Sequence, residues 1–227
     1  MIPLRDANPS RRLPFITILL IAANCAVFFY ELSLGPHGLQ RLVYLLGMVP
    51  ARVTAFPTNP DIGAGDALVP LLTSMFLHGG WLHLIGNMWF LWIFGDNIED
   101  RLGHLRFLLF YLLCGLGAGL VHTLFNLGST IPAIGASGAV AGVLGGYFLL
   151  FPGARVLTLV PFFVVFLAEL PAWLILLYWF LLQVLSGAIS LGARQGEVGG
   201  VAWWAHVGGF VIGFFLVRLL GGRRQRR

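Results

Sequence analysis

The sequence contains no lysine, few carboxylates and only two cysteines among its 227 residues. Charged residues make up 10% of the chain and hydrophobic residues 58%. Soluble domains carry about a quarter charged residues, so this deficit of charge excludes an ordinary soluble domain. The composition indicates an integral membrane protein, and the length predicts a single helical bundle rather than several domains.

The positions of the two cysteines and of the arginines argue against a disulfide-rich protein and against a nucleic-acid-binding protein. Cys25 and Cys114 both lie within apolar runs, which predicts buried free thiols and argues against a disulfide framework. All 14 basic residues are arginines, and the formal net charge is +5. Such a balance also occurs in proteins that bind nucleic acid, but here the arginines gather beside apolar segments. That placement favours signals of membrane orientation, and we expect no nucleic-acid partner.

Apolar runs and their interruptions predict six membrane helices, so the expected fold class is an all-α polytopic bundle. The predicted spans cover about residues 15–34, 78–94, 106–125, 137–152, 172–190 and 201–219. The fourth span is short, because it starts at Ser137 and ends at Pro152. A long loop at 35–74 follows the first span. In the apolar segment 156–168, which Pro161 interrupts, we expect a buried connector or an early extension of the fifth helix.

The first apolar run follows a basic segment and has no small-residue cleavage pattern after it, which predicts an uncleaved signal anchor. We therefore divide the chain into a basic N-terminus at 1–12, a membrane domain at 13–220 and an arginine-rich tail at 221–227. With the N-terminus inside, only Arg41, Arg52 and Arg194 fall on the outer side. The positive-inside rule then places both termini in the cytoplasm. The tail is most simply a lipid-headgroup anchor, and binding to RNA or the ribosome is the less favoured alternative.

Two polar side chains stand where lipid surrounds the chain. Ser137 lies in the sequence GASG at 135–138, which opens the fourth span, and His206 lies in AHVGG at 205–209 within the sixth. A polar group at membrane depth costs a few kcal/mol, so it usually marks a functional site. A serine and a histidine can form a nucleophile and its base. The structural alternatives are a serine that caps a helix and a neutral histidine bonded to a backbone carbonyl.

Small residues recur every four positions on the two helices that carry these side chains. They are Gly138, Gly142 and Gly146 on the fourth helix, and Gly209 and Gly213 on the sixth. Small residues allow helix backbones to approach closely in a membrane. We therefore expect the two helices to pack together and to bring His206 within reach of Ser137.

The second span adds two possible hydrogen-bond donors. His83 and Asn87 are four residues apart and share one helix face, where both could stabilise an oxyanion. His78, His83 and His206 could instead be read as metal ligands. The sequence has no HExxH motif and no compact ligand spacing, so we rank a metal site well below catalysis and expect no cofactor.

The nine carboxylates do not complete a catalytic triad. None of them lies in the fourth or sixth span, or near the outer half of the second. A Ser-His-Asp arrangement therefore lacks its third member, and the sequence favours a Ser137–His206 dyad.

Four segments follow one another along the six-helix core: LLTSMFLHGGWLHLIGNM at 71–88, GDNIEDRLG at 95–103, GASGA at 135–139 and AHVGGF at 205–210. In this order they resemble the rhomboid family of bacterial intramembrane serine proteases. The resemblance implies that Ser137 is the nucleophile and that His206 is the general base and then acid. It also implies that Asn87, His83 and the Ser137 backbone N–H form the oxyanion hole.

The same resemblance implies a rhomboid-like bundle whose short fourth helix carries the nucleophile. Family members cleave transmembrane or membrane-adjacent segments of other membrane proteins without a cofactor. The site would open to the outer side of a bacterial plasma membrane, and the loop at 35–74 would lie partly in the membrane beside the second helix. The sequence does not indicate an oligomeric state.

The sequence departs from the family pattern at two places. Val69-Pro70 stands where some members carry a Trp-Arg pair in the first outer loop, and Ala141 stands where some carry an aromatic that packs on the catalytic histidine. These departures concern the anchoring of the loop and the way the imidazole is held, because neither removes a catalytic group.

The sequence favours three other functions less. A non-proteolytic relative that binds and escorts membrane proteins would be favoured by loss of Ser137 or His206, and both are present. A channel or transporter would show ionisable residues along several helices or paired broken helices in two related halves. An α/β-hydrolase is excluded, because its Gly-x-Ser-x-Gly turn needs a preceding strand and Ala139 replaces the last glycine.

Overall fold

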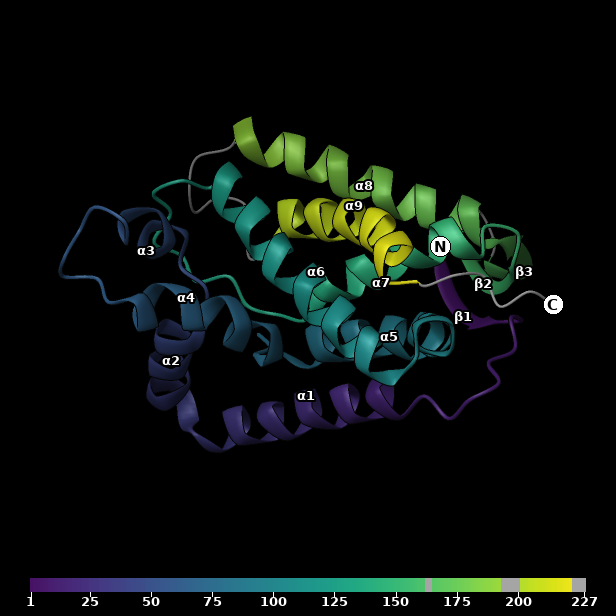
Figure 1. The fold of residues 1–227 in the computed structure, drawn as a ribbon, viewed down its shortest axis with the longest axis horizontal. Helices are drawn as coiled ribbons and strands as arrows, with labels where there is room; N and C mark the ends of the chain where they lie inside the picture. Colours follow the sequence, from purple (N-terminus) through teal and green to yellow (C-terminus); the bar gives the residue numbers. More distant parts are fainter. Residues whose placement is uncertain (162–164, 193–200, 222–227) are drawn as a thin grey trace.

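The structure is a computed structural model that describes residues 1–161, 165–192 and 201–221. It is mostly helical, and its long helices lie side by side with a small sheet at one end (Figure 1). Six helices correspond to the six predicted spans. They are α1 (Phe15–Ser33), α5 (Trp81–Leu102), α6 (His104–Phe125), α7 (Ser137–Leu150), α8 (Ala172–Gly192) and α9 (Trp203–Leu220).

By length and composition, four of these helices could cross a membrane unaided, namely α1, α6, α8 and α9. Helix α5 meets the same criterion together with the preceding helical segment Ala64–Phe76, and the two are bent by 78°. Helix α7 is apolar but shorter, as its sequence predicted. The chain is therefore a polytopic helical bundle, which confirms the expected fold class.

The segment between α1 and α5 is helical rather than an extended loop. It forms α2 (Gly35–Leu46), α3 (Pro50–Ala55), α4 (Ala64–Thr73) and the 3₁₀ turn η1 (Ser74–Phe76). Helices α3 and α4 pack against α6, which corresponds to the third predicted span. From the sequence, we expected this segment beside the second span. Pro70 lies inside α4 and is buried, so the Val69-Pro70 dipeptide is accommodated within a helix.

The expectation for residues 156–168 was wrong. The described residues of this segment, 156–161 and 165–168, belong to strands β2 (Arg155–Pro161) and β3 (Val165–Pro171), which pair antiparallel, and β2 also pairs with β1 (Ile2–Asp6) in the order β1-β2-β3. The segment is rich in β-branched and aromatic residues and is bounded by prolines, which suits a strand more than a helix. Strand β2 hydrogen-bonds on one side to β3 and on the other to β1 from the N-terminus, and the second pairing could not be predicted from a local pattern.

Helix α7 occupies the centre of the bundle, in contact with α5, α6, α8 and α9. All its residues from Gly138 to Tyr147 are buried. Helix α9 approaches the α7 backbone so closely that a Cβ on Gly213 would overlap the carbonyl oxygen of Gly142. This confirms the packing of the fourth and sixth spans that the small residues predicted.

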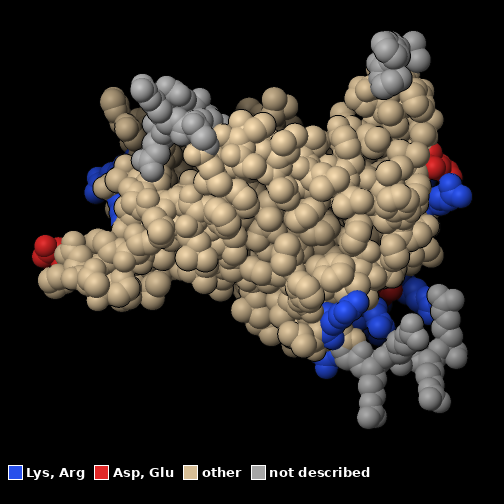
Figure 2. Space-filling view, turned by 90° about the horizontal axis from the view of Figure 1, so that it is seen from above, with Lys and Arg blue, Asp and Glu red and all other residues tan. Residues whose placement is uncertain are grey.

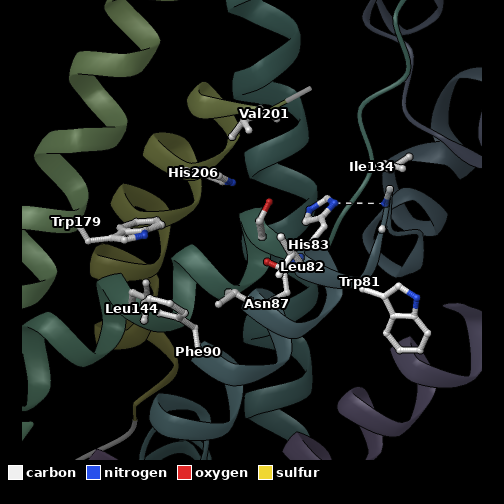
Figure 3. A pocket seen from close by; sticks show the side chains of 16 residues that line it. Trp81, Leu82, His83, Asn87, Phe90, Ile134, Leu144, Trp179, Val201 and His206 are labelled. Atoms are coloured by element: carbon white, nitrogen blue, oxygen red, sulfur yellow. Dashed lines mark hydrogen bonds between the residues drawn. The ribbon is translucent and has the colours of Figure 1, made fainter. Parts of the chain in front are cut away.

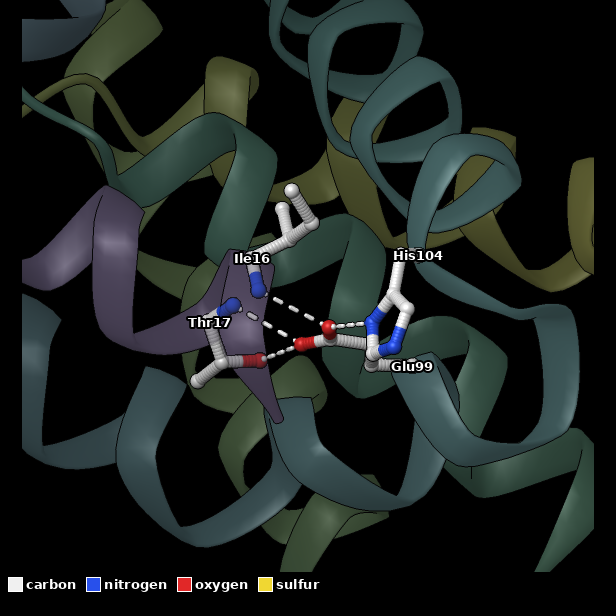
Figure 4. A network of polar contacts seen from close by, with 4 residues as sticks. All are labelled: Ile16, Thr17, Glu99 and His104. Atoms are coloured by element: carbon white, nitrogen blue, oxygen red, sulfur yellow. Dashed lines mark hydrogen bonds and ion pairs between the residues drawn. The ribbon is translucent and has the colours of Figure 1, made fainter. Parts of the chain in front are cut away.

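A buried carboxylate ties α1 to the end of α5 (Figure 4). The two oxygens of Glu99 accept hydrogen bonds of 2.8 Å from the backbone N–H groups of Ile16 and Thr17, and one also accepts from the Thr17 hydroxyl at 2.7 Å. His104 lies against the same carboxylate. A helix leaves its first N–H groups without internal acceptors, so Glu99 supplies the cap that the sequence beside α1 lacks.

On the face shown in Figure 2, charged side chains gather toward the two ends and leave a broad uncharged surface between them. The directions of the helices place the start of α1, the end of α5 and the end of α9 on the same side as the sheet. Arg5, Arg101, Arg155 and Arg218 therefore lie on one side, and Arg41 and Arg52 on the other. The residues Arg194, Glu197 and the tail from 222 onward lie outside the described residues.

Both cysteines are free: Cys114 is buried and Cys25 is half-buried. This confirms the prediction that neither takes part in a disulfide, whereas the predicted burial is correct for Cys114 and wrong for Cys25.

Candidate active site

A cavity of about 800 Å³ opens between α5, α7, α8 and α9. Most of its lining is apolar, and its polar side chains are His83, Asn87, Ser137 and His206. His206 projects from α9, and His83 and Asn87 from α5, toward the same space (Figure 3). The four residues that the sequence singled out therefore line one cavity, although they come from three helices.

Ser137 is the first residue of α7. The segment before it is irregular and is held at two points: the Gly135 N–H donates to the carbonyl of Ser74 at 2.9 Å, and Met48 and Ala133 pair through their backbones. Irregular backbone at this depth is tolerated where protein buries it or where it lines a cavity. The start of α7 also presents free N–H groups and the positive end of the helix dipole beside Ser137.

His206 lies one turn into α9 and is buried, with 9% of its surface exposed. Its Nδ1 lies 2.8 Å from Oε1 of Gln183, a buried residue of α8. The rings of Trp179 and Trp203 stand 5.8 and 6.1 Å from the imidazole, measured between ring centroids. Some family members carry an aromatic residue at the position of Ala141, on α7. In this chain, side chains of α8 and α9 hold the imidazole instead.

The structure contains no hydrogen bond between Ser137 and His206, both of which are described residues. Catalytic hydrogen bonds are often long or misaligned without substrate and tighten in the reacting complex. The close seam between α7 and α9 keeps the two side chains on the same cavity wall.

The ring nitrogens of His83 have distinct roles. Its Nδ1 accepts a hydrogen bond of 3.4 Å from the Gly79 N–H, so in the neutral ring Nε2 carries the proton. That Nε2 faces the backbone just before Ser137, because a Cβ built on Gly135 would lie 2.5 Å from it. Gly135 also has φ +123°, a conformation that L side chains rarely adopt. His83 therefore presents a donor to the entrance of α7.

The side-chain amide of Asn87 already has one hydrogen-bond partner. Its amide nitrogen lies 3.1 Å from Nε2 of His78, whose Nδ1 lies 3.3 Å from the Phe76 carbonyl oxygen. If the His78 Nδ1 proton goes to that carbonyl, Nε2 accepts from Asn87. One N–H of the Asn87 amide then remains for the cavity, and His78 acts as its support rather than as a cavity group.

Gln183 is the residue at this site that the sequence reasoning missed. A Ser-His-Asp arrangement would require a carboxylate, whereas Gln183 is a neutral amide in the middle of an apolar helix. A polar side chain at membrane depth was the signal that identified Ser137 and His206, and the same signal applies to Gln183. Within the described ranges, no group of three His, Cys, Asp or Glu side chains could hold a metal ion.

Comparisons with a protein-family model and with known proteins point to the same family. The family described as the Rhomboid domain matches residues 66–223. The chain is 33% identical over 225 residues to "RHOMBOID-like protein 6, mitochondrial" of Arabidopsis thaliana, which covers 89% of this chain and 67% of that protein. It is 38% identical over 158 residues to "RHOMBOID-like protein 4" of the same plant, covering 67% of this chain and 34% of that protein.

A fungal protein shows the same similarity. "Rhomboid protein 1, mitochondrial" of Saccharomyces cerevisiae is 31% identical over 169 residues, which cover 70% of this chain and 45% of that protein. The chain thus spans from about a third to two thirds of the length of these curated relatives. These relatives are plant and yeast proteins, and they do not indicate a bacterial branch.

Proposed function

This chain belongs to the rhomboid family, and we propose that it is an intramembrane serine endopeptidase that cleaves transmembrane or membrane-adjacent segments of other membrane proteins. Membership supports an intramembrane protease type of function. One observation carries the proposal for this chain: Ser137, His206, His83 and Asn87 line a single, mostly apolar cavity between membrane helices.

In the proposed reaction, the Ser137 hydroxyl attacks the scissile carbonyl while Nε2 of His206 takes its proton. The carbonyl oxygen becomes an oxyanion, and the leaving amine receives the proton back from His206. A water molecule then attacks the acyl-serine, and His206 acts again as base and acid. Only two side chains exchange protons in this scheme, so it needs neither cofactor nor metal.

Three donors are suited to stabilise the oxyanion. They are the Nε2–H of His83, the free N–H of the Asn87 amide and the N–H groups at the start of α7. Preorganised donors of this kind act strongly where water is excluded. The absence of a side chain at Gly135 allows the His83 ring to lie against the backbone just before Ser137.

The cavity size and lining favour an extended apolar peptide as substrate. Ligand cavities typically enclose 300–1,000 Å³, and this one has about 800 Å³ lined by residues such as Phe90, Val140, Leu144 and Trp179. A transmembrane segment that locally unwinds would offer both the apolar side chains and the exposed peptide bond.

The orientation in the membrane belongs to the proposal as well. The arginines of the described chain lie mostly on the side of the sheet, which supports a cytoplasmic position for that side and an outward opening for the cavity. The domain limits at 1–12, 13–220 and 221–227, and the bacterial plasma membrane, stay predictions. The organelle names belong to the plant and yeast relatives.

A serine-directed fluorophosphonate probe tests the proposal most directly. Wild-type protein in detergent should be labelled covalently at Ser137, and the Ser137→Ala and His206→Ala variants should not be labelled. Each variant's melting temperature serves as the control for folding. An intact parent that neither reacts with the probe nor cleaves a transmembrane substrate would shift the assignment to the binding and escort function.

A further inference from the structure

We infer that Gln183 is the positioning residue for His206: its side-chain oxygen fixes the imidazole as the Nδ1–H tautomer and leaves the Nε2 lone pair to Ser137. The inference rests on the proposed function for its catalytic meaning. It concerns α8, a helix to which the sequence assigned no site residue.

The hydrogen bonds of Gln183 determine which end of its amide faces the histidine. Nε2 of Gln183 donates to the carbonyl oxygen of Trp179, one turn earlier in α8, at 3.1 Å. A backbone carbonyl can only accept, so the amide nitrogen must lie on that side. Oε1 consequently faces His206, where it lies 2.8 Å from Nδ1.

The orientation of this amide in turn determines the protonation of the imidazole. An amide oxygen can only accept a hydrogen bond, so Nδ1 of His206 carries the proton that joins them. A neutral imidazole has one N–H, and Nε2 is then the unprotonated nitrogen. This is the nitrogen that a base needs in order to take the proton of Ser137.

Burial makes the hydrogen bond hard to exchange for water. Gln183 is 6% exposed and His206 9% exposed. The Trp179 and Trp203 rings stand beside the imidazole and limit its rotation. Gln183 itself is not among the described residues that line the cavity, so it lies behind His206 as seen from the substrate.

The role is positioning and involves no proton transfer by Gln183. When His206 accepts the Ser137 proton at Nε2, the ring becomes an imidazolium and its Nδ1–H stays bonded to the amide oxygen. A hydrogen bond to a charged group is stronger than one between neutral groups. Gln183 therefore stabilises the charged intermediate state of the base more than its resting state, and it does so without a carboxylate in the membrane.

The test uses Gln183→Met, which has a similar unbranched shape but no acceptor for the imidazole. We expect kcat for a model transmembrane substrate in liposomes to fall about 10- to 100-fold, in line with loss of one hydrogen bond to a group that becomes charged. KM should stay within about twofold, because Gln183 does not line the cavity. Gln183→Glu keeps an oxygen acceptor and should retain more activity than the methionine variant. Gln40→Met, at an exposed position of α2, is the matched control and should leave kcat unchanged.

A second readout does not depend on activity. Long-range ¹H–¹⁵N correlation spectra of ¹⁵N-histidine protein distinguish the two neutral tautomers, and His206→Ala identifies the His206 signals by difference. The parent and Ser137→Ala should both show the Nδ1–H form of His206, whereas Gln183→Met should show a mixture of both forms.

Several results would overturn the inference. One is a parental kcat in Gln183→Met, and another is the Nε2–H form of His206 in the parent. A third is a loss of activity that follows a lower melting temperature while the tautomer stays the same, since that result assigns a purely structural role. If the parent cleaves nothing and no probe labels Ser137, the proposed protease function fails, and the spectra still decide whether Gln183 holds the His206 tautomer.

Discussion

Gly209 on α9 lies so close to Gly138 on α7 that a Cβ at position 209 would overlap the carbonyl oxygen of Gly138. These glycines adjoin the proposed dyad, because Gly138 follows Ser137 and Gly209 lies three residues after His206. The separation between nucleophile and base is therefore set by a backbone contact that tolerates no side chain.

Gly209→Ala should accordingly push α9 away from α7. Overpacking of this kind costs about 1–3 kcal/mol, and we expect a lower melting temperature together with a loss of substrate cleavage. Gly65→Ala, at an exposed position of α4 where an added Cβ has no neighbour within 4 Å, is the control. Equal activity in Gly209→Ala and the parent would show that the seam does not set the catalytic distance.

Removal of either proposed catalytic group should abolish cleavage. We expect Ser137→Ala and His206→Ala each to reduce kcat by about 10⁴-fold or more, as in soluble serine proteases. Cleavage of a model transmembrane substrate in liposomes measures this, and the melting temperature checks the fold. If either correctly inserted variant cuts as fast as the parent, the dyad is the wrong assignment.

Asn87→Ala should cause a smaller loss. A single oxyanion donor is worth about 10²–10³ in kcat in soluble enzymes. The variant also removes the 3.1 Å contact with His78, so His78→Phe is the informative companion: it breaks the same contact but keeps the amide. A larger loss in Asn87→Ala than in His78→Phe supports the oxyanion role, and equal losses would assign Asn87 to scaffolding alone.

Asp6 should make stability depend on pH. Partial burial raises the pKa of this carboxyl to about 6, although the hydrogen bond of 2.7 Å from the Tyr147 hydroxyl opposes the shift. The unfolded chain loses that proton near its ordinary pKa of about 4. Between these values the folded state holds the extra proton, so this contribution to stability is present below about pH 4 and is lost as pH rises through 6.

Asp6→Asn should flatten this part of the profile and raise stability above pH 6 relative to the parent. Thermal unfolding in detergent between pH 4 and 8 measures the slope. Asp61→Asn, which removes one carboxylate from an exposed loop, controls for the change in net charge. An unchanged slope in Asp6→Asn would contradict the prediction.

Loss of the Glu99 carboxylate should loosen α1. Glu99→Ala leaves the Ile16 and Thr17 N–H groups without their acceptor, at a cost of about 1–3 kcal/mol for unsatisfied buried donors. We expect a lower melting temperature, measured in detergent. Glu169→Ala, at an exposed position of β3, is the matched control. Equal melting temperatures for the Glu99 variant and the parent would show that water caps α1 as well as Glu99 does.

The membrane class and the positions of the helices could be predicted from the sequence, because apolar runs must match the thickness of a bilayer. Helix α1 starts at the predicted residue, and α7 begins at Ser137. The segment 156–168 was misread because it is apolar without a decisive period, and its strand partner, β1, lies about 150 residues earlier in the chain.

Local sequence thus determined which residues are unusual for a membrane helix: a serine at a helix start, a histidine in an apolar helix, and glycines at intervals of four. Only the tertiary structure decided how they meet. It placed four side chains from three helices around one cavity, and it set the amide of Gln183 against His206. The direction of an amide and the tautomer of a ring depend on acceptors from other helices, and those are fixed by packing rather than by position in the chain.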